Sequence, residues 1–202
     1  MRIAIPDLAG SATLTFGDED RLSDDQYLAF CEANPDLNVE RTPRGEIVIV
    51  PPAGLESDNR NVTVVFFLRK WALEDGRGES FGPTAQFLLP DGSGLSPDAA
   101  WVSNERLSEL SPAQKKKFPR LAPQFVIEVM SPSDRLRPAQ EKMRQWAING
   151  VELGWLIDGD SRCVYVYRGT AEPRLVADSD SIAGEGPVEG FVLPLTKIWR
   201  GL

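Results

Sequence analysis

The chain has 202 residues, of which 42% are hydrophobic and 26% charged, and this composition fits one soluble globular domain with a substantial core. It contains no histidine, which excludes imidazole bases, Ser-His-Asp triads and most zinc sites. The net charge of −8 argues against non-specific binding of nucleic acid over the whole surface.

Two further features concern the compartment. Apolar runs are too short for a membrane span, and residues 1–15 lack the apolar core of a secretory signal. Cys31 and Cys163 each lie in an apolar setting, which favours buried free thiols in a reducing compartment. We therefore expect a cytoplasmic protein without a membrane partner.

The predicted elements begin after an N-terminal extension, residues 1–21. Ser23 and the acidic residues after it predict a helix to about residue 33. A hairpin follows over residues 37–42 and 46–50, then a long helix over residues 57–73. The broad apolar face of this helix is predicted to contain Val62, Val65, Phe66, Leu68, Arg69, Ala72 and Leu73. A second hairpin is predicted over residues 80–89 and 96–102, and a short helix over residues 106–110.

The second half contains a central strand, residues 125–131, and a helix that Pro138 opens and Asn149-Gly150 ends. Two strands follow at residues 153–157 and 163–168, and the tail, residues 187–202, reads as short strands and turns. This order predicts an α/β fold, with one mixed β-sheet flanked by helices in a single domain over residues 22–202.

The central strand carries an acid in an apolar run, Phe-Val-Ile-Glu-Val-Met-Ser, which is typical of a strand buried on both faces. Alternation puts Glu128 on one face with Val126 and Met130. An unpaired buried carboxylate costs several kcal/mol or takes up a proton. Glu128 therefore needs a basic side chain, a hydrogen-bond network or a metal ion, and the strand itself leaves the choice open.

A second acid, Asp98, follows Pro97 at the start of the apolar segment 99–102. If this segment pairs with the central strand so that both acids share a face, two carboxylates lie within several ångströms and repel each other. A divalent cation relieves that repulsion, and hard oxygen ligands suit Mg²⁺ or Mn²⁺. The alternative is that Asp98 is only a turn acid.

Lys142 is the third candidate. On its predicted helix, Ala139, Met143 and Trp146 form a packed stripe, and Lys142 falls on the border of that stripe. Its ammonium could reach back over the sheet to orient or deprotonate an attacking water. The alternatives are a surface lysine with a buried stem, or a salt bridge from Lys142 or Arg135 to Glu128 without chemistry.

Pro97-Asp98 followed by Glu128 in its apolar strand resembles the PD-(D/E)XK nuclease superfamily, and the wider sequence is similar to its Uma-type family of putative restriction-endonuclease-like proteins. The resemblance covers about residues 22–195, and its most specific segments are residues 54–61, 88–92, 96–102, 123–129 and 142–158. It implies a restriction-endonuclease-like core and metal binding by Asp98 and Glu128, with Glu40 as a further ligand or a holder of water. The superfamily lysine stands two residues after the second acid, where this chain has Met130, so the resemblance moves that role to Lys142.

The resemblance implies Mg²⁺-dependent (or Mn²⁺-dependent) hydrolysis of phosphodiester bonds in DNA. Residues 103–144 hold nine basic and five acidic side chains, a local sum of +4, and phosphate contacts are expected there. The candidates are Lys115, Lys116, Lys117, Arg120, Arg135 and Arg137. Two strands to cut favour a homodimer. The alternatives are a non-catalytic DNA- or protein-binding module of the same fold, and an interaction protein with a closed ion network.

Overall fold

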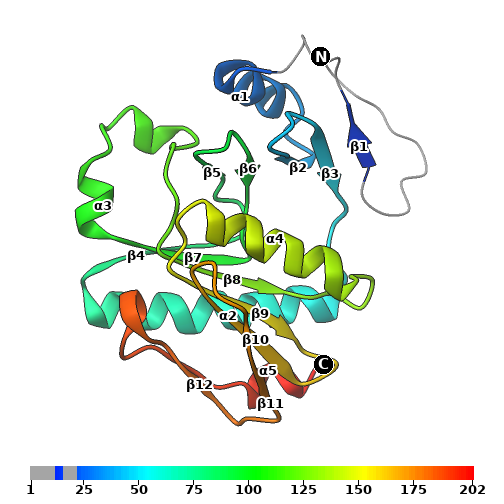
Figure 1. Cartoon of the computed structure of the whole chain (residues 1–202), viewed down its shortest axis with the longest axis vertical. Coiled ribbons are helices and arrows are strands. Elements are labelled where there is room, and N and C mark those ends of the chain that lie inside the picture. Colours follow the sequence, from blue (N-terminus) through cyan, green and yellow to red (C-terminus); the bar gives the residue numbers. More distant parts are fainter. Residues whose placement is uncertain (1–11, 16–21) are drawn as a thin grey trace. The chain divides into compact units, whose positions relative to one another are not determined.

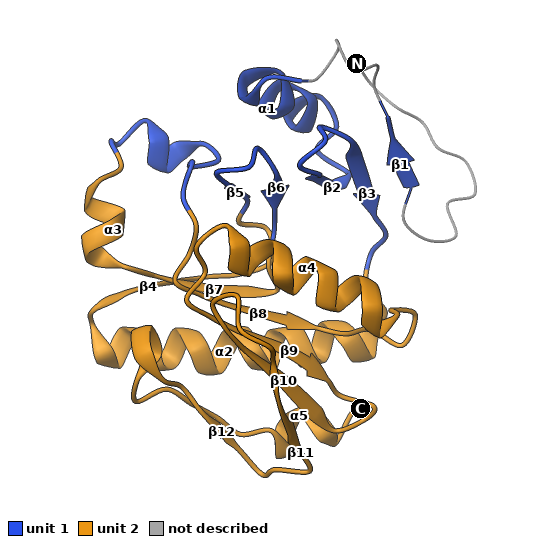
Figure 2. Ribbon diagram, in the orientation of Figure 1, with its two compact units in different colours: residues 1–52, 86–96, 111–121 blue, residues 53–85, 97–110, 122–202 orange. Residues whose placement is uncertain are grey.

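The computed structural model describes residues 12–15 and 22–202, which form two compact units (Figures 1 and 2). Unit 1 comprises the chain up to residue 52 together with residues 86–96 and 111–121, and unit 2 comprises residues 53–85, 97–110 and 122–202. Apart from residues 12–15, the predicted N-terminal extension lies outside the described residues, and the single domain over residues 22–202 stays a prediction. Over the described residues, no helix has both the length and the apolar character needed to cross a membrane.

Unit 1 contains helix α1 (Asp24–Ala33) and a five-stranded antiparallel sheet in the order β1-β3-β2-β6-β5. Ser23 caps the start of α1, as the sequence predicted, and Gln26 completes a capping box with it. The strands are β1 (Ala12–Leu14), β2 (Asn38–Arg41), β3 (Ile47–Val50), β5 (Phe87–Leu88) and β6 (Gly94–Leu95), and a 3₁₀ turn, η1, spans Gln114–Lys116. The predicted first hairpin is confirmed as β2 and β3.

Unit 2 is a six-stranded mixed sheet in the order β11-β10-β9-β8-β7-β4. The strands are β4 (Gly78–Phe81), β7 (Ala99–Ser103), β8 (Phe125–Val129), β9 (Leu153–Asp158), β10 (Cys163–Arg168) and β11 (Arg174–Ala177). Neighbouring strands are antiparallel except β8 and β9, which α4 (Leu136–Ile148) connects as a parallel crossover. The predicted α/β fold with a mixed sheet and flanking helices is therefore confirmed. The expectation of one sheet was wrong, because the first hairpin belongs to the separate antiparallel sheet of unit 1.

Two long helices cover opposite faces of this sheet. Helix α2 (Leu55–Asp75) packs on β4, β7 and β8, whereas α4 packs on β8, β9 and β10 (Figure 1). The smaller elements of unit 2 are α3 (Asn104–Ser108), β12 (Ile182–Ala183), η2 (Gly186–Val188), β13 (Val192–Leu193) and α5 (Thr196–Trp199).

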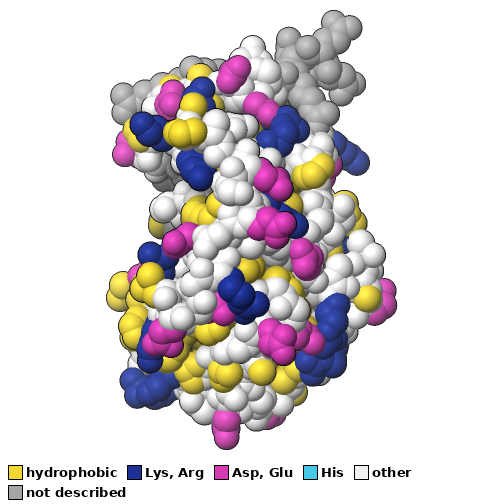
Figure 3. Space-filling view, turned by 90° about the vertical axis from the view of Figure 1, so that its left-hand side faces the viewer, with side chains coloured by type: hydrophobic (Ala, Val, Ile, Leu, Met, Phe, Trp, Pro, Cys, Tyr) yellow, Lys and Arg dark blue, Asp and Glu magenta, His cyan; other side chains and the backbone are white. Residues whose placement is uncertain are grey.

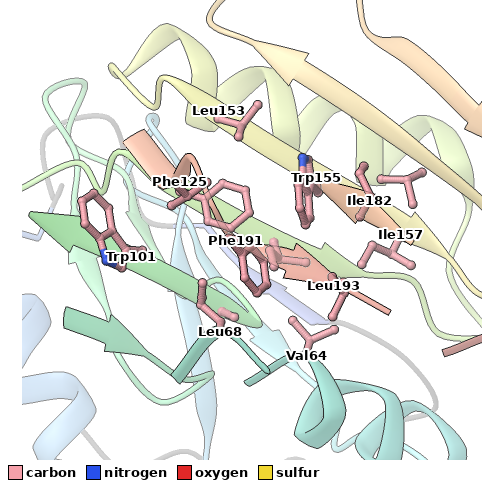
Figure 4. Packing of buried hydrophobic residues seen from close by; sticks show 14 of the residues in the cluster. Val64, Leu68, Trp101, Phe125, Leu153, Trp155, Ile157, Ile182, Phe191 and Leu193 are labelled. Atoms are coloured by element: carbon pink, nitrogen blue, oxygen red, sulfur yellow. The ribbon is translucent and has the colours of Figure 1, made fainter. Parts of the chain in front are cut away.

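The main core of unit 2 lies on the α2 face of the sheet (Figure 4). Phe125 of β8 and Trp155 of β9 meet edge to face, and the indole of Trp155 stacks on Phe191, with Leu68 of α2 in the same cluster. All five residues of β8 are buried, as the apolar run predicted. Glu128 therefore lies on the opposite face from Phe125, beneath α4.

Two sequence-based expectations were wrong in part. Of the apolar face expected for α2, Leu68 and Ala72 are buried, together with Val64, whereas Val62, Phe66 and Leu73 are exposed. Hydrophobic residues surround this helix on most sides, so periodicity alone does not select the inward face. The expected second hairpin is also two separate pairs, β4 with β7 and β5 with β6. The thiols of Cys31 and Cys163 are free, as expected.

Candidate active site

The two predicted acids lie at the same end of the β7–β8 ladder. Ala99 pairs with Ile127, so the antiparallel register continues to place Asp98 opposite Glu128. The backbone N–H of Val129 donates a hydrogen bond of 2.7 Å to Asp98 Oδ2. The Asp98 side chain thus continues the ladder by one hydrogen bond, because it accepts an N–H directly before the first residue of β7. This arrangement places the carboxylate against the backbone of the residue that follows Glu128.

The other oxygen of Asp98 is held by a residue that the sequence reasoning missed. Asn61 Nδ2 of α2 donates to Asp98 Oδ1 at 3.0 Å. Asn61 stands three residues before Val64 and seven before Leu68, on the inward stripe of α2, which was the signal in the sequence. Its own Oδ1 is buried and has no hydrogen-bond partner among the described protein groups. A hard oxygen donor therefore lies beside Asp98 with its acceptor capacity unused.

Glu128 is 9% exposed and is compensated from α4. Lys142 Nζ lies 3.0 Å from Glu128 Oε1 and 3.2 Å from Oε2, and Trp146 Nε1 donates to Oε1 at 2.8 Å. Lys142 and Trp146 are one helical turn apart, so both reach the same carboxylate. The predicted lysine does meet the predicted acid in the structure. The contribution of Trp146 was missed, because its place on the packed stripe explained it as core.

Met130 occupies the position where the superfamily has its lysine, and it is buried at 8% exposure. Lys142 instead approaches Glu128 from the helix that covers this face of the sheet. The Lys142 side chain is 28% exposed, so the ion pair is accessible to solvent from the α4 side. Ammonium and carboxylate therefore meet at a partly desolvated position, where charge interactions are stronger than in open water.

Glu40 belongs to β2 in unit 1, where its Oε1 accepts a hydrogen bond of 3.2 Å from the backbone N–H of Ser96. Its participation at the site of Asp98 and Glu128 stays a prediction. Over residues 12–15 and 22–202, no three histidine, cysteine, aspartate or glutamate side chains form a group that could hold a metal ion. Any metal site built here relies on two carboxylates at most, with other oxygen donors.

The six basic residues expected to contact DNA are divided between the two units. Lys115, Lys116, Lys117 and Arg120 belong to unit 1, whereas Arg135 and Arg137 stand at the start of α4 in unit 2. All six are exposed, and Arg120 is paired with Asp24. On the face drawn in Figure 3, basic and acidic side chains are interspersed, without a large area of one sign. Phosphate contact at these residues stays a prediction.

The mixed sheet, the flanking helices and the two acids at the end of adjacent strands define an α/β protein of the restriction-endonuclease-like class. A family model described as "Uma2: Putative restriction endonuclease" matches residues 24–196, and the chain belongs to that family.

A solved structure shares the fold. It is a putative nuclease belonging to DUF820 from Anabaena variabilis ATCC 29413, and it superposes with a TM-score of 0.73 at 18% sequence identity. The match covers 89% of this chain and 98% of that one. No curated protein matches the chain. Family and fold together indicate a restriction-endonuclease-like nuclease, as expected from the sequence.

Proposed function

We propose that this protein is a Mg²⁺-dependent (or Mn²⁺-dependent) endonuclease that hydrolyses phosphodiester bonds in DNA. The observation that carries the proposal is the contact of Lys142 with Glu128, 3.0 Å between Nζ and Oε1, beside the end of β7 where Asp98 is held. An acid pair with an ammonium group is the set that the superfamily uses, and here α4 provides the ammonium that Met130 cannot. Family and fold support the same reading.

The donor set fits a hard divalent cation. Mg²⁺ is commonly bound by one or two carboxylates, with waters in the remaining positions. Asp98 and Glu128 would hold it, and the buried, unpartnered Oδ1 of Asn61 adds a neutral oxygen next to Asp98. When bound, such a cation polarises the phosphodiester and lowers the pKa of a bound water.

The protein side chains then have separate tasks. Asn61 and the N–H of Val129 fix the orientation of the Asp98 carboxylate, since each holds one of its oxygens. Trp146 does the same for Oε1 of Glu128. Lys142, placed by α4, would stabilise the negative charge that develops on the phosphate oxygens.

One observation favours the second candidate, a non-catalytic DNA- or protein-binding module. Glu128 already has an ion pair and an indole hydrogen bond, and Asp98 already has two donors. Carboxylates satisfied in this way form a closed network that holds β7, β8, α2 and α4 together without a cation. This candidate differs from the first in two observables, metal affinity and cleavage.

The test is cleavage of supercoiled plasmid with Mg²⁺ or Mn²⁺ by the wild-type protein and by Asp98→Asn, Glu128→Gln and Lys142→Met. Glu141→Gln is the matched control, because Glu141 precedes Lys142 on α4 and is exposed. We expect cleavage to fall at least about 100-fold in the three site variants and to stay unchanged in the control. Cleavage that survives Asp98→Asn and Glu128→Gln would reject the assignment. Metal-independent DNA binding without cleavage would establish the second candidate.

In this proposal the six basic residues contact the DNA backbone. The protein acts in the cytoplasm as a homodimer, with one active site for each DNA strand. Each phosphate contact contributes about −0.9 to the slope of log affinity against log salt concentration. Replacement of Lys116 by Gln should therefore reduce the magnitude of that slope by about 1 and weaken all DNA sequences alike. A slope that does not change would remove Lys116 from the proposed contact surface.

A further inference from the structure

The first two turns of α2 are packed by a buried arginine. The helix begins after Gly54, which provides no side-chain cap, and its first buried apolar residue is Val64. Between these two positions Ser57 and Arg60 are the buried residues, so Arg60 is the large side chain that packs this end of the helix. An uncapped helix end frays unless tertiary contacts hold it. The contacts of Arg60 therefore decide where the start of α2 lies.

Arg60 connects α2 to the turn after β9. Its Nη2 lies 2.8 Å from Glu56 Oε1 of the same helix and 2.9 Å from Asp160 Oδ1 of the turn. A Cβ added to Gly159 would lie 2.6 Å from Cζ and Nη1 of Arg60 and 2.8 Å from its Nε, so this glycine packs over the flat face of the guanidinium. Nε and Nη1 are buried without a hydrogen-bond partner among the described protein groups. The bonds of Nη2 and the close packing of Gly159 therefore carry the contact.

Arg60 and Asn61 reach the two strands that flank β8. Arg60 contacts the residues directly after β9, and Asn61 donates to Asp98, directly before β7. Strand β9 runs parallel to β8 and β7 antiparallel to it, so the end of β9 and the start of β7 lie at the same end of the sheet. Consecutive helix residues point about 100° apart, which lets these two neighbours contact different strands. A shift of Arg60 would therefore move the amide of Asn61 relative to Asp98.

We propose that Arg60 is a positioning residue for Asp98. It fixes the second turn of α2 on the turn after β9, and thereby holds Asn61 where its amide orients the carboxylate of Asp98. A direct phosphate contact is disfavoured, because Arg60 is 3% exposed and Glu56 and Asp160 already balance its charge. The inference deepens the proposed nuclease site, and its meaning for catalysis rests on that proposal. The positioning itself can be measured without metal or DNA.

The experiment measures amide hydrogen exchange by NMR in the metal-free protein. The N–H of Val129 donates to Asp98 Oδ2 and is the reporter, whereas the N–H of Met130 donates to the carbonyl of Ile157 and is the internal reference. We expect the ratio of the Val129 rate to the Met130 rate to rise at least about ten-fold in Arg60→Met, because a hydrogen bond to a charged group contributes at least that factor. A general loss of stability would raise both rates and leave the ratio unchanged.

Three further variants test the route of this effect. Asn61→Ala alone should raise the ratio as much as Arg60→Met, and the double variant should raise it no further, because Arg60 acts through Asn61. In Gly159→Ala the new Cβ displaces the guanidinium and keeps its charge, so the ratio should rise again even if Arg60→Met folds poorly. Arg69→Met is the matched control, since Arg69 is a half-exposed arginine further along α2, and should leave the ratio unchanged.

Calorimetry with Mn²⁺ extends the test to the proposed function. Changes to the groups that orient a metal ligand typically weaken metal binding about 10–100-fold, and we expect a loss of this size in Arg60→Met and Gly159→Ala. A wild-type chain that binds no Mn²⁺ would refute the proposed metal site, and the exchange of Val129 would still decide the positioning role. An unchanged ratio in Arg60→Met and Gly159→Ala, or effects that add in the double variant, would overturn the inference.

Discussion

The ion pair between Glu128 and Lys142 gives the most direct test of the site geometry. Lys142→Met removes the ammonium but keeps the length and apolar stem of the side chain, so Glu128 loses its ion pair while the neutral indole of Trp146 still donates to it. Breaking a fully buried pair costs about 3–5 kcal/mol, and an exposed pair is worth about 0–1 kcal/mol. The Lys142 side chain is 28% exposed and that of Glu128 12%, so we expect an intermediate loss of about 2 kcal/mol.

The assay is thermal and urea unfolding of a double-mutant cycle with Glu128→Gln, which can still accept from Trp146. A loss of about 2 kcal/mol lowers Tm by about 4–8 °C in a chain of this size. The double variant should lose about 1–2 kcal/mol less than the sum of the two singles, because the second change removes the uncompensated charge. Arg144→Met, an exposed change on the same helix, should stay within about 0.5 kcal/mol of wild type. Additive losses, or a Lys142→Met variant as stable as the control, would refute the contact.

Two further predictions concern stability away from the site. Burial alone raises the pKa of Asp24, but hydrogen bonds and charges from Arg41 and Arg120 outweigh it and hold this pKa below its usual value. The ionised Asp24 carboxylate therefore stabilises the fold above about pH 4, and this contribution is lost as the pH falls further. In urea unfolding, Asp24→Asn should lower the free energy of unfolding by about 1–2 kcal/mol at pH 7, and by progressively less below pH 4. Gly78→Ala brings a Cβ within 2.4 Å of a backbone carbonyl and should cost about 3 kcal/mol by thermal unfolding. In Gly154→Ala the new Cβ comes too close only to the end of the flexible Met143 side chain, so we expect a cost of about 1 kcal/mol. Equal costs at the two glycines, or a pH-independent effect at Asp24, would contradict these arguments.

Local signals in the sequence were enough to find most of the elements that build the site. The cap at Ser23, the apolar run around Glu128 and the stop at Gly150 each depend on a few neighbouring residues, and each element formed where it was expected. The pairing of strands, by contrast, depends on residues that are far apart in the sequence. The segment after α2 pairs with β7 and leaves the hairpin expected over residues 80–102 divided, because the sheet of unit 2 competes for the same strand.

The charged groups of the site could be predicted from the sequence. A buried acid needs compensation, and Lys142 was the cation on the correct helix face. Its neutral partners were not visible, because Trp146 and Asn61 both lie on inward stripes that packing already explains. The hydrogen bonds they donate, to Glu128 and Asp98, appear only when the helices are docked on the sheet.

The placement of the ammonium on α4, in place of the strand, leads to a last prediction. Residue 130 directly follows β8, two residues after Glu128, and its backbone N–H still bonds to Ile157 of β9. If the alternation of the strand continues by one residue, a lysine there shares the face of Glu128 and is within reach of it. In the wild-type chain, Met130→Lys adds a second, desolvated ammonium beside an acid that Lys142 already neutralises, and should cost about 2 kcal/mol. In the Lys142→Met background the same lysine supplies the missing charge and should raise Tm. Urea unfolding compares the chains with and without Met130→Lys, once in the wild-type background and once in the Lys142→Met background. It measures whether the new lysine stabilises or destabilises each chain. If Met130→Lys destabilises both chains alike, Glu128 does not depend on a nearby cation, and the ammonium of α4 is not a substitute for one on the strand.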